Sequence, residues 1–239
     1  MKLKYLPLVG ALTMTAPAFA ISVNMTDFSF TGPRDVTATD SATGFSFSGE
    51  AGRFNGTLAD GASPAARFGP TASDASASAS ASFTAYCAEL TQSFNFNVNY
   101  EYQWVSGDAY FGAARAANLS RLFTAADQAG FVVDSVTSSA MQAAIWEIIY
   151  ESASSFNLLT GTFTSSPENP SYQTAFTTVN GFLLNLGSFG TNFKIEALTN
   201  ATAQDFLVAT PVPEPGTWAL LVGGLGVVGL MARRRKTTT

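Results

Sequence analysis

The pattern of hydrophobic and polar residues divides the chain into strands, then helices, then strands again. Residues 22–55 contain short alternating segments separated by Gly, Pro, Asp and Thr, which predict strands and turns. Residues 83–87, FTAYC, predict a strand that leads to a cysteine. Residues 94–104, FNFNVNYEYQW, alternate without a break and predict a strand with one face on the core and one in water.

The spacing of apolar residues becomes helical after Gly107. The segment FGAARAANLSRLFTAADQ has its apolar residues at helical spacing, and Gly130 predicts the end of that helix. A second helix is predicted where Ser138 or Thr137 can cap the N-terminus. Its apolar stripe, at i, i+3, i+4, i+7 and i+8, consists of Met141, Ala144, Ile145, Ile148 and Ile149. Residues 172–187 predict a third, weaker helix.

The order of these elements predicts an α+β fold. Strand patterns resume at 193–195 and 206–208, so an antiparallel β-sandwich or barrel-like core would carry a helical insertion over about 111–154. Residues 56–82 lack large apolar side chains over most of their length and end in SDASASASAS, which predicts an exposed loop or linker. The segment 21–210 is long enough to bury the core of one domain.

Both ends of the chain read as targeting segments. Residues 1–20 have a basic start, an apolar middle and a small-x-small end, which predict a secretory signal peptide cleaved before Ile21. Near the other end, Pro213, Glu214 and Pro215 precede an apolar run over 218–232 and then a cluster of arginines.

This tail supports two interpretations. A helix that spans a bilayer needs about 20 apolar residues, so the 15-residue run would make a short tail anchor at most, with its basic end in the cytoplasm. The layout of motif, short glycine-rich helix and arginine cluster resembles the PEP-CTERM sorting signal over 211–239. That resemblance implies a Gram-negative envelope protein that an exosortase processes and that sits in the inner membrane through 218–232 before processing.

Composition excludes several functions. Residues 21–215 contain six basic and seventeen acidic residues, which disfavours binding to nucleic acid or to an anionic membrane. The chain has no histidine, so histidine-based catalysis and histidine metal sites are excluded, and no nucleotide-binding motif or EF-hand-like loop is present. We therefore expect no cofactor and no metal. The single cysteine excludes a disulfide within the chain.

The cysteine has a candidate reaction partner. Cys87 ends its predicted strand, and Gln142 lies in the first turns of its predicted helix, so its side chain would sit at the helix entrance. A thiolate can attack a carboxamide carbon, expel ammonia and leave an internal thioester, and a helix N-terminus can stabilise the oxyanion. Glu89 is the candidate proton shuttle, with Glu151 or Asp134 as alternatives.

A lone cysteine more often packs as a small hydrophobe, and a helical glutamine more often faces water. Two motifs favour the reactive interpretation: aromatic-Cys-apolar at 86–88 and Gln-x-Ala-apolar-Trp at 142–146. Together they resemble the thioester domains of bacterial surface adhesins, specifically over 83–151. The resemblance implies a Cys87–Gln142 bond, although Met141 stands where that family often has threonine. Tyr86, Ile145 and Trp146 would shield the bond from water.

The low lysine content of the chain favours the thioester interpretation, because a thioester is an acyl donor that lysine amines attack. Lys194 is the only lysine between the two processed ends, and a lysine-poor exterior would limit self-reaction, although an acidic composition alone also depletes lysine. The sequence therefore predicts an adhesin, not an enzyme, that attaches covalently to an amine or hydroxyl of a surface protein or polysaccharide. The alternatives are a noncovalent exopolysaccharide or biofilm matrix protein, and a carbohydrate-active enzyme using Glu147 and Glu151.

Overall fold

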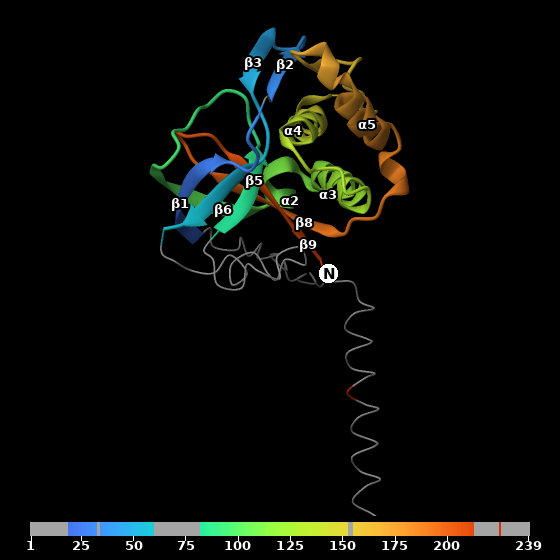
Figure 1. Cartoon of the computed structure of the whole chain (residues 1–239). Coiled ribbons are helices and arrows are strands. Elements are labelled where there is room, and N and C mark those ends of the chain that lie inside the picture. Colours follow the sequence, from blue (N-terminus) through green and yellow to red (C-terminus); the bar gives the residue numbers. More distant parts are fainter. Residues whose placement is uncertain (1–18, 33, 60–81, 153–154, 213–224, 226–239) are drawn as a thin grey trace, which may run out of the picture.

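The computed structural model describes residues 19–32, 34–59, 82–152, 155–212 and 225. A closed antiparallel barrel and a small separate sheet enclose a layer of helices (Figure 1). The strands are β1 (Phe19–Phe28), β2 (Asp35–Asp40), β3 (Phe45–Glu50), β4 (Phe54–Leu58), β5 (Ser82–Cys87), β6 (Asn99–Ser106), β7 (Phe163–Pro167), β8 (Phe193–Thr199) and β9 (Phe206–Pro211). The helices are α2 (Gly107–Phe111), α3 (Ala113–Gln128), α4 (Ser135–Tyr150) and α5 (Gln173–Leu184), with 3-10 turns η2 (Pro170–Tyr172) and η3 (Leu186–Ser188).

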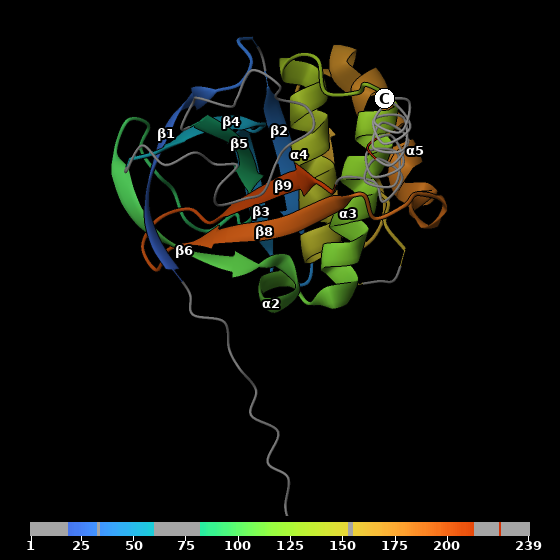
Figure 2. The same ribbon diagram turned by 90° about the horizontal axis from the view of Figure 1, so that it is seen from below.

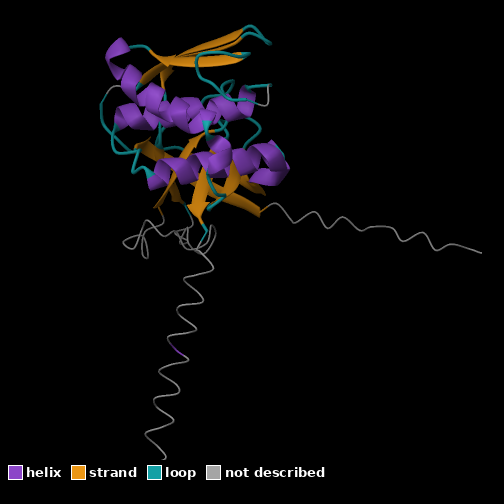
Figure 3. Ribbon diagram, turned by 90° about the vertical axis from the view of Figure 1, so that its right-hand side faces the viewer, coloured by secondary structure: helices purple, strands orange, loops and turns teal. Residues whose placement is uncertain are grey.

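The barrel has the strand order β1-β4-β5-β9-β8-β6 and closes through the β1–β6 pair. The second sheet has the order β3-β2-β7. Figure 3 shows the helices as a layer between this sheet and the barrel, and Figure 2 shows α4 and α3 running beside the barrel strands. The expected α+β fold with a barrel-like core is confirmed, and the sandwich alternative is wrong because the strands of the larger sheet close on themselves.

The helical insertion is confirmed with shifted bounds, since its helices run from Gly107 to Tyr150. The expected helix end at Gly130 is confirmed: Gly130 has a φ of 57°, and the following N–H of Phe131 donates to the carbonyl of Ala126 at 2.9 Å. The third helix is present as α5.

The strand expected over 94–104 is shorter than its pattern. It begins at Asn99, because Asn97 adopts a φ of 61° and turns the chain. The rings of Phe94 and Phe96 instead pack against Phe54. Alternation holds within the strand, where Tyr102 is buried.

The expected loop over 56–82 is also too long. Its first residues belong to β4 and its last begins β5, while 60–81 lie outside the described residues.

The expected signal peptide and tail helix lie almost wholly outside the described residues. Phe19 and Ala20 are described and belong to β1, where they pair with Trp104 and Gln103. The described part of the chain contains no helix that is long and apolar enough to cross a membrane.

Candidate functional site

Strand β5 and helix α4 bring Cys87 and Gln142 together. The backbone N–H of Cys87 donates to Oε1 of Gln142 at 2.8 Å, and Nε2 of Gln142 donates to the carbonyl of Cys87 at 2.9 Å. Gln142 is fully buried, and Cys87 is 8% exposed. The carboxamide is therefore fixed at both its oxygen and its nitrogen by the residue that carries the thiol.

Gln142 does not lie at the helix entrance, so that expectation was wrong. Asp134 caps α4: its carboxylate accepts from the N–H of Thr137 at 2.8 Å, and the Thr137 hydroxyl accepts from the N–H of Asp134. Ser138 is not the cap, and Gln142 is the eighth residue of the helix. The free N–H groups of the helix end are too far along the chain to reach its carboxamide. The donor to the carboxamide oxygen is instead the Cys87 backbone.

Burial governs the acidity of the thiol. It raises the pKa of the Cys87 thiol well above its usual range, and the nearby carboxylate of Glu89 raises it further. The thiol is therefore protonated at neutral pH, and a reaction at the sulfur requires that its proton be removed as the new bond forms.

Glu89 is held near the thiol by three bonds. Its Oε1 accepts from the N–H of Asp205 at 3.1 Å, its Oε2 accepts from the Thr91 hydroxyl, and its carbonyl accepts from Nε2 of Gln204 at 2.6 Å. Burial raises the pKa of Glu89. Its position is consistent with the expected role as a proton acceptor. The carboxylate of Asp134 caps α4 and that of Glu151 accepts from the N–H of Thr162, so neither alternative is the proton acceptor beside the thiol.

The segment after the cysteine is bonded on both sides. The N–H of Ala88 donates to the carbonyl of Asp205, the residue before β9, at 2.8 Å. The N–H of Leu90 donates to the hydroxyl of Tyr150 at 3.0 Å, from the last turn of α4. Sequence reasoning missed Tyr150, Gln204 and Asp205, because their contacts join segments 60 to 116 residues apart and no local pattern marks them.

The three residues expected to shield the pair are all buried. Tyr86 directs its hydroxyl to Ser138 and packs its ring against Phe123. The ring of Trp146 meets Phe47 of β3 edge-on, with centroids 5.3 Å apart. Its indole N–H has no hydrogen-bond partner in the described part of the chain.

The two glutamates of the enzyme alternative are buried structural groups. Oε1 of Glu147 accepts from the N–H of Asn157 at 2.7 Å. Oε2 of Glu151 accepts from the N–H of Thr162 at 2.8 Å and from that of Phe163 at 3.2 Å. Both side chains are buried and hold the loop after α4.

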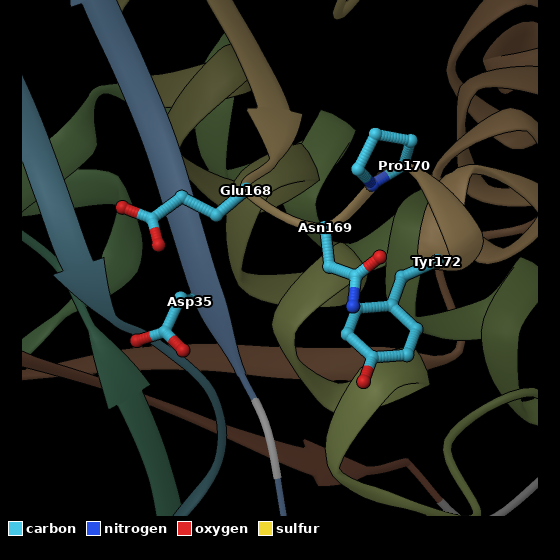
Figure 4. Close-up of a pocket in the computed structure, with 5 residues that line it drawn as sticks. All are labelled: Asp35, Glu168, Asn169, Pro170 and Tyr172. Carbon is cyan, nitrogen blue, oxygen red and sulfur yellow. The ribbon is translucent and has the colours of Figure 1, made fainter.

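A hollow of about 350 Å³ lies elsewhere, between the small sheet and the start of η2 (Figure 4). Asp35, Glu168, Asn169, Pro170 and Tyr172 line it, and Glu168 is hydrogen-bonded to Ser48. None of these residues belongs to the Cys87 site. Within the described residues no group of three or more potential metal ligands occurs. Lys194 forms an ion pair with Glu196.

Comparisons with known proteins identify the tail and no other part of the chain. Residues 211–236 match the family described as the PEP-CTERM protein-sorting motif, and they include the expected Pro213, Glu214 and Pro215. Neither the curated proteins nor the solved structures give a match. The chain is thus an exported surface protein that carries a PEP-CTERM sorting signal and is processed by an exosortase.

Proposed function

We propose that the chain is a surface adhesin that attaches covalently through a thioester between Cys87 and Gln142. The observation that carries the proposal is the pair of hydrogen bonds that fixes the Gln142 carboxamide on the Cys87 backbone. Attack at a carbonyl needs a fixed carbon, a donor on the oxygen and a nearby nucleophile. The N–H of Cys87 is the oxygen donor, and the thiol belongs to the same residue.

In the formation step, Glu89 takes the thiol proton as the sulfur attacks the Gln142 carboxamide carbon. The C–S bond forms, the C–N bond breaks, and the nitrogen leaves as ammonia with the transferred proton. The oxyanion that develops in between accepts from the Cys87 N–H, which already bonds that oxygen in the resting amide.

In the attachment step, an amine or hydroxyl of a surface protein or polysaccharide attacks the same carbon. A C–N or C–O bond forms, the C–S bond breaks, and the sulfur leaves as a thiol with the proton of the nucleophile. Cys87 and Gln142 are then no longer joined, and the chain remains bonded to its target. The protein reacts once and is not an enzyme. We propose that it acts in the cell envelope or on the extracellular surface of a Gram-negative bacterium.

Amine trapping tests this proposal. The folded protein is incubated with methylamine, and its peptides are sequenced by tandem mass spectrometry. The proposal predicts methylamine on Gln142 and one new thiol on Cys87 for each adduct. Cys87→Ala is the control and gives no adduct. Absence of any adduct on Gln142 in the wild-type protein contradicts the proposal.

The second candidate function is a noncovalent matrix protein, and one observation favours it. The same two hydrogen bonds satisfy a buried amide without any reaction, as a purely structural glutamine would. Thiol titration separates the two. The matrix protein shows one thiol after denaturation, whereas the adhesin shows none until its thioester is cleaved.

A further inference from the structure

Helix α4 contacts residues 87–90, the cysteine segment, at two positions along its length. Gln142 is hydrogen-bonded to Cys87, and Tyr150 is hydrogen-bonded to Leu90. Gln142 and Tyr150 are eight residues apart, about 12 Å along the helix, and Cys87 and Leu90 are three residues apart in the chain. The helix is therefore joined to the segment by hydrogen bonds at two separate positions.

We propose that Tyr150 is a positioning residue for the thioester reaction, an inference that rests on the function proposed above. Its hydroxyl accepts the Leu90 N–H and so fixes the register of α4 against the segment that carries the thiol. That register decides whether the Gln142 carboxamide carbon lies within reach of the sulfur.

Alignment is needed before the C–S bond forms, when only noncovalent contacts hold the helix against the segment. When ammonia leaves, Nε2 of Gln142 leaves with it, and its bond to the Cys87 carbonyl is lost. The Tyr150–Leu90 bond does not involve the reacting atoms, so it persists through both steps. The other bonds to this segment come from Gln204 and Asp205 on the barrel side and do not hold the helix.

The molecule offers a matched control. Tyr100 also accepts a backbone N–H on its hydroxyl, from Asn95 at 3.2 Å, and lies in β6 outside the contacts of the cysteine segment. Tyr150→Phe removes the acceptor of the Leu90 N–H, and Tyr100→Phe removes the acceptor of the Asn95 backbone N–H and of its side-chain amide. General loss of stability affects both variants, whereas loss of register affects only the first.

The test refolds each full-length variant from urea, quenches samples with acid and follows the loss of one ammonia by intact mass. The inference predicts that Tyr150→Phe forms the thioester roughly tenfold more slowly than wild type, as expected when one aligning hydrogen bond is lost. Tyr100→Phe should form the thioester within about twofold of the wild-type rate, and the urea midpoints show how much stability each variant has lost.

Formation by Tyr150→Phe at the wild-type rate, or equal slowing in both variants, overturns this inference and leaves the proposed function standing. A wild-type protein that keeps its ammonia contradicts both. Leu90→Pro serves if Tyr150→Phe does not fold, because it removes the donor and keeps the tyrosine. Slow formation in that variant supports the inference, and a wild-type rate contradicts it.

Discussion

The side chain of Gln142 forms hydrogen bonds with both the N–H and the carbonyl of Cys87, at 2.8 and 2.9 Å, although the two residues are 55 positions apart. This pairing works like one rung of a β-ladder, with a glutamine amide in place of a strand. It gives the end of β5 a partner from α4 and places an electrophilic carbon beside the only thiol of the chain.

The first prediction concerns the noncovalent strength of this pairing. In a Cys87→Ala background, where no covalent bond can form, Gln142→Ala should lower the free energy of unfolding. Two buried backbone groups lose their partner, at roughly 1–3 kcal/mol each. Gln173→Ala, at an exposed position of α5, is the control and should change it by less than about 0.5 kcal/mol. Urea titration measures both, and equal effects would show that the pairing contributes little.

The second prediction concerns Trp146. Trp146→Ala should cost roughly 3–5 kcal/mol of stability, because the ring is buried. In the folded variant, water should reach the thioester and free thiol should appear faster than in wild type. Phe47→Leu loosens the packing against the indole and is the control for general loosening. If thiol appears no faster in Trp146→Ala than in this control, the indole is core packing alone.

The third prediction concerns pH. Burial raises the pKa of Glu147 to about 7, from an ordinary value near 4.5. Between these values the folded state retains a proton that the unfolded state has lost, so stability should fall as pH rises from about 4.5 to 7 and change little from this group above that. The effect is at most roughly 3 kcal/mol. Urea midpoints across this range should decline less in Glu147→Gln than in wild type, and parallel curves would contradict the assignment.

The fourth prediction concerns the tail. Deleting 213–239 removes nearly all of the sorting motif and should leave folding intact. The cut falls after Val212, whose N–H donates to the Asn192 carbonyl at 2.7 Å and which is therefore kept in the truncated protein. The truncated protein should be released from the cell envelope. Circular dichroism checks the fold and cell fractionation checks the location, and retention in the envelope would show that another segment holds the protein.

Local patterns predicted the elements that position the site. The strand ending at Cys87 and the apolar stripe of α4 follow from residue spacing, because burial of one face leaves a periodic signal. The pattern Asp134-x-x-Thr137 is a capping box in the sequence as well, and it predicts a helix that begins after Asp134 and contains Gln142 in its interior.

Other features depend on tertiary contacts that leave no local signal. The alternation over 94–104 extends past the true strand because the rings of Phe94 and Phe96 pack with Phe54 of β4. The bond from Leu90 to Tyr150 joins segments 60 residues apart. Barrel closure likewise depends on the pairing of β1 with β6, which no single strand pattern encodes.

The most direct test of the thioester is the intact mass of the freshly purified, folded protein under conditions that leave thioesters intact. The account predicts a mass one ammonia below that of the processed sequence in the wild type, and the full mass in Cys87→Ala and in Gln142→Ala. A wild-type protein at its full sequence mass, with one thiol that reacts after unfolding, would contradict the account.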